Sequence, residues 1–163
     1  MNPSLRFSLV AALVAGASVF TSGALAATAS GTANATVLTP IAIAAGTALN
    51  FGTIAANAAG GTVVLTSAGV RSKTGTVVLT AAAFSVGTLT VTGTGSSTFA
   101  VTYPGSFNVT SGANTMGVVV SGAATGTLAG GTVSLPVGGT LTVGANQIAG
   151  SYTGSYTMTV EYN

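Results

Sequence analysis

GSYTGSYTMTVEYN, residues 150–163, alternates between two kinds of residue without interruption. Even positions are aromatic, apolar or Gly, and odd positions before Asn163 are Ser, Thr or Glu161. Successive side chains of a β-strand point to opposite faces, so a period of two predicts a half-buried strand. We therefore predict a packing strand whose inward face comprises Gly150, Tyr152, Tyr156, Met158, Val160 and Tyr162.

The first residues have the features of an export signal. Arg6 precedes an apolar run over residues 7–20, and Ala24, Leu25 and Ala26 form a small-x-small cleavage site. This order is typical of a secretory signal peptide. We expect residues 1–26 to be removed and residues 27–163 to form one exported domain without a membrane anchor.

Charged residues make up only 2% of the chain. After the predicted signal, Arg71, Lys73 and Glu161 are the charged side chains, which leaves no basic surface for nucleic acid. So little charge also provides little repulsion between copies. The composition favours a protein that associates with other protein subunits.

Catalytic and metal-binding residue types are scarce. The chain has no His, no Cys and one acidic residue, so His-dependent triads, carboxylate pairs and side-chain cages for zinc or calcium are excluded. Lys73 lies in SAGVRSKTG, which we interpret as an exposed loop rather than the buried setting that activates a lysine. We predict a non-enzymatic protein with no cofactor and no metal.

Short segments rich in Val and Thr, separated by Gly, Asn, Ser and Pro, recur along the chain. Many short strands of this kind predict an all-β, antiparallel sandwich. The predicted strands are residues 32–44, 48–54, 61–67, 75–80, 83–92, 98–103, 116–121, 132–135, 139–143 and 152–162. Pro40, within the first of them, indicates an edge strand or a strand that changes sheets.

Two further patterns have simple structural interpretations. The near-repeat GTVVLT at residues 61–66 and 75–80 is interpreted as two adjacent arms of a hairpin. The aromatic residues that follow the signal lie in or beside apolar strand patterns, which favours core packing over a sugar-binding platform.

Sheet edges in this chain lack the charged residues that usually prevent pairing with other chains. An extended segment of one subunit could therefore add a strand to the next subunit. Ala29, Gly31, Ala33, Ala35 and Val37 alternate with polar residues and form the candidate donor strand. The same stretch also fits a disordered leader.

The end of the chain, with Gly150 fourteenth from the last residue and Tyr162 penultimate, resembles the signature of chaperone-usher pilus subunits. The segments LNFGTI (49–54), VGGTLTV (137–143) and GSYTGSY (150–156) resemble a family of small secreted bacterial proteins, domain of unknown function 4402. That family is similar to spore-coat-U-like and fimbrial adhesin sandwiches.

This resemblance implies an immunoglobulin-like sandwich that is secreted to the periplasm or the bacterial cell surface. It also implies that the sandwich serves as a structural subunit of a surface fibre or coat. Its implied partners are other copies of the chain, a periplasmic chaperone and an outer-membrane usher. The alternative is a self-complete secreted module that binds carbohydrate or mediates adhesion.

Overall fold

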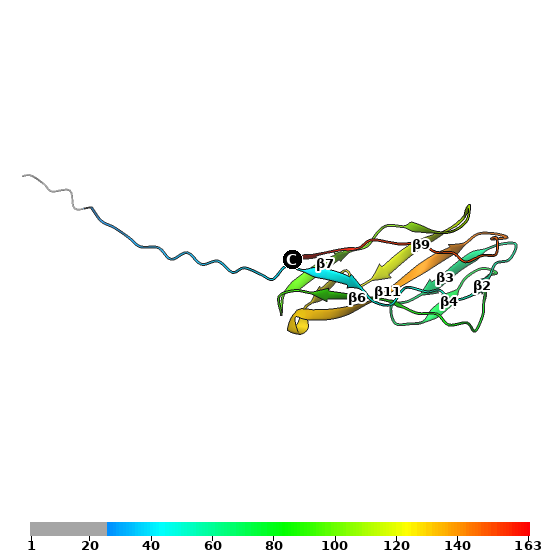
Figure 1. Ribbon diagram of the computed structural model, residues 1–163, viewed down its shortest axis with the longest axis horizontal. Helices are drawn as coiled ribbons and strands as arrows, with labels where there is room; N and C mark the ends of the chain where they lie inside the picture. The colour runs from blue at the N-terminus through cyan, green and yellow to red at the C-terminus, as the bar shows by residue number, and fades with distance from the viewer. Residues whose placement is uncertain (1–25) are drawn as a thin grey trace, which may run out of the picture. The chain divides into compact units, whose positions relative to one another are not determined.

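The computed structural model describes residues 26–163 (Figure 1). The predicted export signal, apart from Ala26, lies outside the described residues. Residues 26–40 are all exposed and none lies in a helix or strand. Residues 36–163 belong to one compact unit, which contains every strand of the described chain.

Twelve strands and one short helix are present in residues 26–163. The strands are β1 (Ala42–Ala45), β2 (Ile54–Ala55), β3 (Gly61–Leu65), β4 (Arg71–Lys73), β5 (Val78–Leu79), β6 (Gly87–Thr92), β7 (Thr98–Thr102), β8 (Phe107–Ser111), β9 (Asn114–Gly122), β10 (Thr125–Thr127), β11 (Thr132–Val143) and β12 (Thr159–Tyr162). A single 3₁₀ turn, η1 (Ala129–Gly131), precedes β11. Strands account for 46% of the described residues and helix for 2%, and all strand pairs are antiparallel, so the prediction of an all-β antiparallel sandwich is confirmed.

The long strand β11 organises the larger sheet (Figure 1). Val137 is opposite Gly87 of β6 and also opposite Gly122 of β9, so β6 and β9 lie on opposite edges of β11. Residues 139–141 are paired with both β9 and β3. It follows that β6 and β3 lie end to end on the same edge of β11. Outward from these strands, β1 pairs with β6, β4 with β3, and β8 with β9.

The smaller sheet has the order β10-β7-β12. The chain passes from one sheet to the other between β9 and β10, which are separated by only Ala123 and Ala124. In this sheet β12 is an end strand, paired with β7 on one side, and in the larger sheet β1 is an end strand, paired with β6. The outer edges of β1 and β12 are thus without a neighbouring strand, as are those of β4, β8 and β10.

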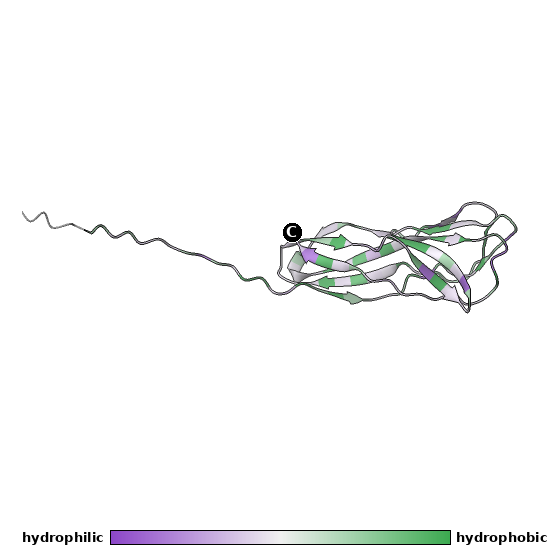
Figure 2. Ribbon diagram, turned by 90° about the horizontal axis from the view of Figure 1, so that it is seen from above, coloured by the Kyte–Doolittle hydropathy of each residue, from purple (hydrophilic) through white to green (hydrophobic). Residues whose placement is uncertain are grey.

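Side chains from the strands form two buried clusters. The first is centred on Phe99 and Leu128, from the smaller sheet and its connection to β11, with Val91 and Val137 of the larger sheet. The second is centred on Val63, Val77, Val118 and Leu141. Hydrophobic and hydrophilic positions alternate along the strands (Figure 2). This alternation places one face of each strand in a core and leaves the other in solvent.

Gly138 lies in the middle of β11, where β6 and β3 meet. The predicted strands at 132–135 and 139–143 were separated at this point, because Pro136 and two glycines interrupt the pattern. In the structure they form one strand. Gly138 has no side chain, and any Cβ at this position would collide with the main chain of residues 65–67. The glycine therefore permits close approach of β3 rather than ending the strand.

Other predictions of strands and loops also need correction. The segment 32–44 forms a strand only at 42–45, because the Ala, Gly and Thr residues before it have no neighbouring strand to pair with. Similarly, 48–54 contains only one bridge, at Asn50, and the start of β2. The loop predicted around Lys73 contains β4, an edge strand in which Ser72 and Lys73 are exposed and Arg71 is half-buried. Strands β8 and β10 were not predicted.

The hairpin interpretation of the near-repeat is also wrong. Its first copy forms β3, which pairs with β4, whereas its second copy contributes β5, which pairs with β2. Because the pairing partners differ, the repeated sequence reflects common strand composition rather than a repeated structural unit.

Candidate functional site

A groove lies between the free edges of the two sheets. One wall is residues 43–54, which begin in β1, and the other is residues 150–158, which lead into β12. We call this the edge groove. The two walls run in opposite directions, since Ile43 and Met158 line one end, while Ile54 and Gly150 line the other.

Two adjoining cavities make up the edge groove. The first, of about 360 Å³, lies beside β1 and includes Ile43, Leu89 and Met158 in its lining. The second, of about 700 Å³, has a floor of side chains from β8, β9 and β11, namely Phe107, Val109, Met116, Val118 and Leu141. Ala48 and Tyr156 line both cavities. The groove is therefore continuous, and it is wider at the end away from β12.

The first wall has main-chain groups available for pairing. Asn50 exchanges two main-chain hydrogen bonds with Ser85, at 2.9 and 3.0 Å, on the side away from the groove. Main-chain groups of neighbouring residues in an extended chain point in opposite directions, so those of Leu49 point toward the groove. Within residues 26–163, the N–H and C=O of Leu49 make no hydrogen bond.

The second wall is similarly free. Thr153 exchanges two main-chain hydrogen bonds with Thr110, and β12 pairs with β7 from Thr159 onward. Between them, the main chain of residues 154–158 makes no hydrogen bond to any described residue. The edge groove thus has an apolar floor and unpaired main-chain groups on both walls, which are the features that bind an added β-strand.

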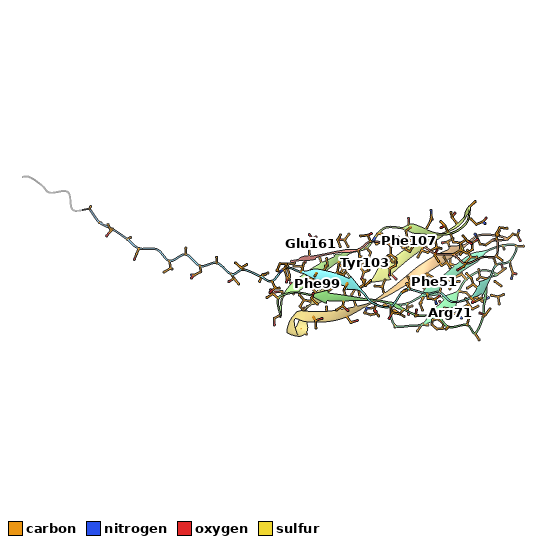
Figure 3. The ribbon with its side chains drawn as sticks, viewed as in Figure 1. Phe51, Arg71, Phe99, Tyr103, Phe107 and Glu161 are labelled. Carbon is orange, nitrogen blue, oxygen red and sulfur yellow. The ribbon has the colours of Figure 1, made fainter. Side chains whose placement is uncertain are left out.

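Arg71 fixes the outer side of the first wall. Its guanidinium donates one hydrogen bond to the carbonyl oxygen of Phe51, at 3.0 Å, and another to that of Thr80. It also lies over the ring of Phe84, 4.5 Å from the ring centroid. Figure 3 shows Arg71 and Phe51 in the same part of the sandwich, far from Glu161. One arginine therefore joins β4, the groove wall and the segment before β6.

Replacing Arg71 by Ala is expected to lower the free energy of unfolding by about 2 kcal/mol, because two carbonyl oxygens lose a charged donor. Arg71→Lys should recover little of this loss, since an ammonium cannot donate through a planar fork. Urea unfolding monitored by tyrosine fluorescence measures the difference. Lys73→Ala, two residues along the same strand and exposed, is the control, and equal losses in the two alanine variants would contradict this role for Arg71.

Tyr156 lines the edge groove, and Tyr103 lies close to Tyr156. The rings of Tyr156 and Phe107 are tilted with their centroids 5.2 Å apart. Burial raises the pKa of Tyr156, and it also raises the pKa of Tyr103, with a further contribution from the nearby Tyr156. The Tyr103 hydroxyl donates to the carbonyl oxygen of Ala123 at 2.9 Å. Both phenols are held in the neutral form.

Stability is expected to fall at alkaline pH. Since both tyrosines have a raised pKa in the folded state, the folded protein binds these protons more tightly than the unfolded chain does. The stabilisation that these two protonated tyrosines provide is complete below about pH 10, the ordinary pKa of tyrosine. It is lost as the pH rises through the raised pKa values of the folded state. Thermal unfolding across a pH series measures it. The double variant Tyr103→Phe and Tyr156→Phe should reduce the loss above pH ~10, and an unchanged loss would contradict the assignment.

Of the predicted packing residues, Gly150, Tyr152, Tyr156 and Met158 line one wall of the groove, whereas Val160 and Tyr162 follow that wall in β12. Tyr152, Tyr156, Val160 and Tyr162 are half-buried and Met158 is buried, whereas the odd-numbered residues between them are exposed. Gly150 is exposed and lines the wide end of the groove. Hydrogen-bonded strand is limited to β12 and a bridge at Thr153, so the predicted strand 152–162 is shorter than expected. All five candidate donor residues are exposed.

Sequence reasoning did not identify the groove floor. Phe107, Val109 and Met116 belong to β8 and β9, whose neighbours in the sheet could not be assigned from local patterns. It also assigned Phe84 to the core, although 41% of its surface is exposed. The run of alternating residues in VTYPGSFNVTS offered a signal for β8, but Pro104 and Gly105 obscured it.

Comparison with known proteins places this fold in a family. Residues 41–162 match the model of the family described as Domain of unknown function (DUF4402). The chain belongs to this family. The match covers the sandwich from just before β1 to the end of β12, so the edge groove lies entirely within the DUF4402 domain. No curated protein and no solved structure matches the chain.

The edge groove of the DUF4402 domain is lined by uncharged side chains. None of Arg71, Lys73 and Glu161 lines either cavity. Across residues 26–163, no helix has the length and apolar character required to span a membrane. The groove offers shape, apolar surface and main-chain hydrogen-bonding groups.

Proposed function

We propose that the protein is a non-enzymatic structural subunit of a bacterial surface fibre or coat, and that its subunits join by strand donation. The observation that carries this proposal is the edge groove, which lies between two unpaired sheet edges. Exposed edges pair readily with extended segments of other chains. A strand in this groove would pair with main-chain groups on both walls and cover the apolar floor.

The proposed donor is the stretch of residues 27–37 of a second copy, which we call the arm. Its eleven residues would extend over about 36 Å at about 3.3 Å per residue. The groove wall of residues 43–54 has twelve residues, so the two are similar in length. All arm residues are exposed in the described chain, and none is charged. Neither partner would bury a charge on binding.

Side-chain size supports the same donor. Leu49, Phe51, Phe107 and Tyr156 are large side chains that line the groove. An arm whose inward face consists of Ala29, Gly31, Ala33 and Ala35 can approach them closely, and Val37 supplies the one larger apolar group. Small residues on the donor therefore complement large residues on the groove.

The fibre proposal extends to the assembly partners that the pilus resemblance implies. An unfilled groove exposes apolar surface, and such surface promotes aggregation. A periplasmic chaperone would cover it until an arm arrives, and an outer-membrane usher would bring subunits together. Export of the chain, which both partners require, is part of this proposal.

The carbohydrate-binding alternative receives less support. A sugar platform requires exposed aromatic faces, and in residues 26–163 Phe84 is the only aromatic residue classed as exposed. Arg71 lies over its ring. We therefore retain the structural subunit as the proposed function.

A competition experiment tests the proposal. The full chain is expressed with its own leader, purified from the periplasm and analysed by light scattering in the presence of a synthetic peptide of residues 27–37. Excess peptide is expected to fill the groove and shift assemblies to the mass of a single subunit. A control peptide with Asp at positions 33 and 35 should have no effect. Assemblies that persist at saturating peptide, or equal effects of both peptides, would contradict strand donation.

A further inference from the structure

The arm is joined to the sandwich through a clamp at Thr39. The hydroxyl of Tyr162 donates a hydrogen bond to the carbonyl oxygen of Thr39, and the N–H of Thr39 donates to Oγ1 of Thr94, both at 2.7 Å. The N–H of Thr94 in turn donates to the Tyr162 hydroxyl at 2.7 Å. Both main-chain groups of Thr39 are thus bound to residues that follow β6 or end β12.

The clamp keeps the chain in line with β1. Ala42 is opposite Thr92 in the β1–β6 pair, so continuing this register places residues 39–40 beside residues 94–95. The Thr39–Thr94 hydrogen bond shows that the chain follows this course. Gly93 makes room for it, because any Cβ there would collide with the Tyr162 hydroxyl. The edge groove lies along the opposite edge of β1.

An arm that filled the groove of its own subunit would have to reverse direction between Val37 and Ala42. Two-residue hairpin turns require a positive φ at the first central residue, which Gly, Asn and Asp adopt most readily. Residues 35–45, ATVLTPIAIAA, contain none of these three residue types.

Pro40 makes the reversal still less favourable. Its ring fixes φ near −65°, which excludes the first central position of the primed turns. It also disfavours the helical conformation for Thr39, which longer loops built on a type I turn would need. Ile41 is β-branched and resists a positive φ. The linker therefore opposes a turn by its sequence, and the clamp opposes it by its hydrogen bonds.

We infer that the Thr39 clamp and the turn-resistant linker prevent each subunit from filling its own groove, so that the arm remains available to a second copy. This inference rests on the proposed function, because it assumes that the arm binds in an edge groove. It adds the reason why binding occurs between subunits rather than within one. The residues responsible are Thr39, Thr94 and Tyr162 in the clamp and Pro40 in the linker.

The test converts the linker into a hairpin turn. In the full chain, the double variant T39N/P40G introduces Asn-Gly, the preferred sequence of a type I′ turn. An arm in its own groove acts at an effective concentration in the millimolar range. We therefore expect association between subunits to weaken about a hundredfold, measured by light scattering across a dilution series. Hydrogen exchange should show that the arm amides are protected in the resulting monomer.

Single-atom variants separate the clamp from general destabilisation. Tyr162→Phe removes the hydroxyl that binds Thr39 and keeps the ring, so it should shift part of the population to protected monomer. Tyr103→Phe removes a hydroxyl that binds Ala123 instead and should leave association unchanged.

The possible outcomes distinguish this inference from the proposed function. A parent chain that associates, with a monomeric T39N/P40G variant whose arm is protected, supports the inference. If the parent is already a monomer with a protected arm, the inference is overturned and groove filling by the arm is retained. If the parent is a monomer with neither arm nor groove amides protected, both are overturned. A T39N/P40G variant that associates as tightly as the parent overturns the role of the linker.

Discussion

Replacing Val160 by Asp is expected to abolish accumulation of the folded protein in the periplasm. Val160 packs against the cluster that contains Phe99 and Val101, and it is opposite Val101 in the β12–β7 pair. Removing its side chain from the core costs about 1.5–3 kcal/mol, and placing a carboxylate there adds a larger desolvation penalty. The total is a large fraction of the stability of a typical domain.

Thr159→Asp is the matched control for this prediction. Thr159 is the adjacent residue in β12 and its side chain is exposed, so the same charge should be tolerated there. Immunoblots of periplasmic extracts, with the soluble fraction checked by protease resistance, measure both variants. Equal amounts of folded Val160→Asp and parent protein would show that the even-numbered face of this strand does not pack the core.

The double variant A33D/A35D is expected to weaken association between subunits at least a hundredfold. Both residues lie on the face of the arm that would contact the groove floor, and burying a carboxylate on apolar side chains without a partner is strongly unfavourable. All arm residues are exposed in the described chain, so the fold of the sandwich should not change. Light scattering across a dilution series measures the association constant.

The control places the same charges on the other face of the arm. Thr32 and Thr36 alternate with the inward residues and would face solvent in a donated strand, so T32D/T36D should reduce association only slightly. Equal losses in the two double variants would indicate a general charge effect rather than a strand with a defined inward face. No loss in either would exclude the arm as the donor.

Local alternation explains how much of the fold was predictable. Strands β3, β6, β7 and β9 bury alternate side chains in the sandwich, so composition and a period of two are visible together in the sequence. The packing residues of the groove wall followed from the same pattern. β4 was missed because an edge strand can form from main-chain hydrogen bonds with polar side chains such as Ser72.

Non-local pairing explains what was not predictable. The edge groove arises because β1 and β12 lie at the ends of different sheets, and no local pattern identifies which strands are neighbours. The Thr39 clamp joins residues 123 positions apart in the sequence. Conversely, the alternation over residues 32–41 gave a wrong strand prediction. A period of two shows that one face of a segment could be buried, but it does not show whether a neighbouring strand is present to pair with it.

The most direct test of strand donation is hydrogen exchange of the Leu49 amide in the full chain at high and low protein concentration. This N–H points toward the groove and has no hydrogen-bond partner in the described chain. If a second copy supplies a strand, the amide should be protected at high concentration and exchange rapidly after dilution. A Leu49 amide that exchanges equally fast at both concentrations, in a sample that contains assemblies, would contradict filling of the edge groove by another subunit.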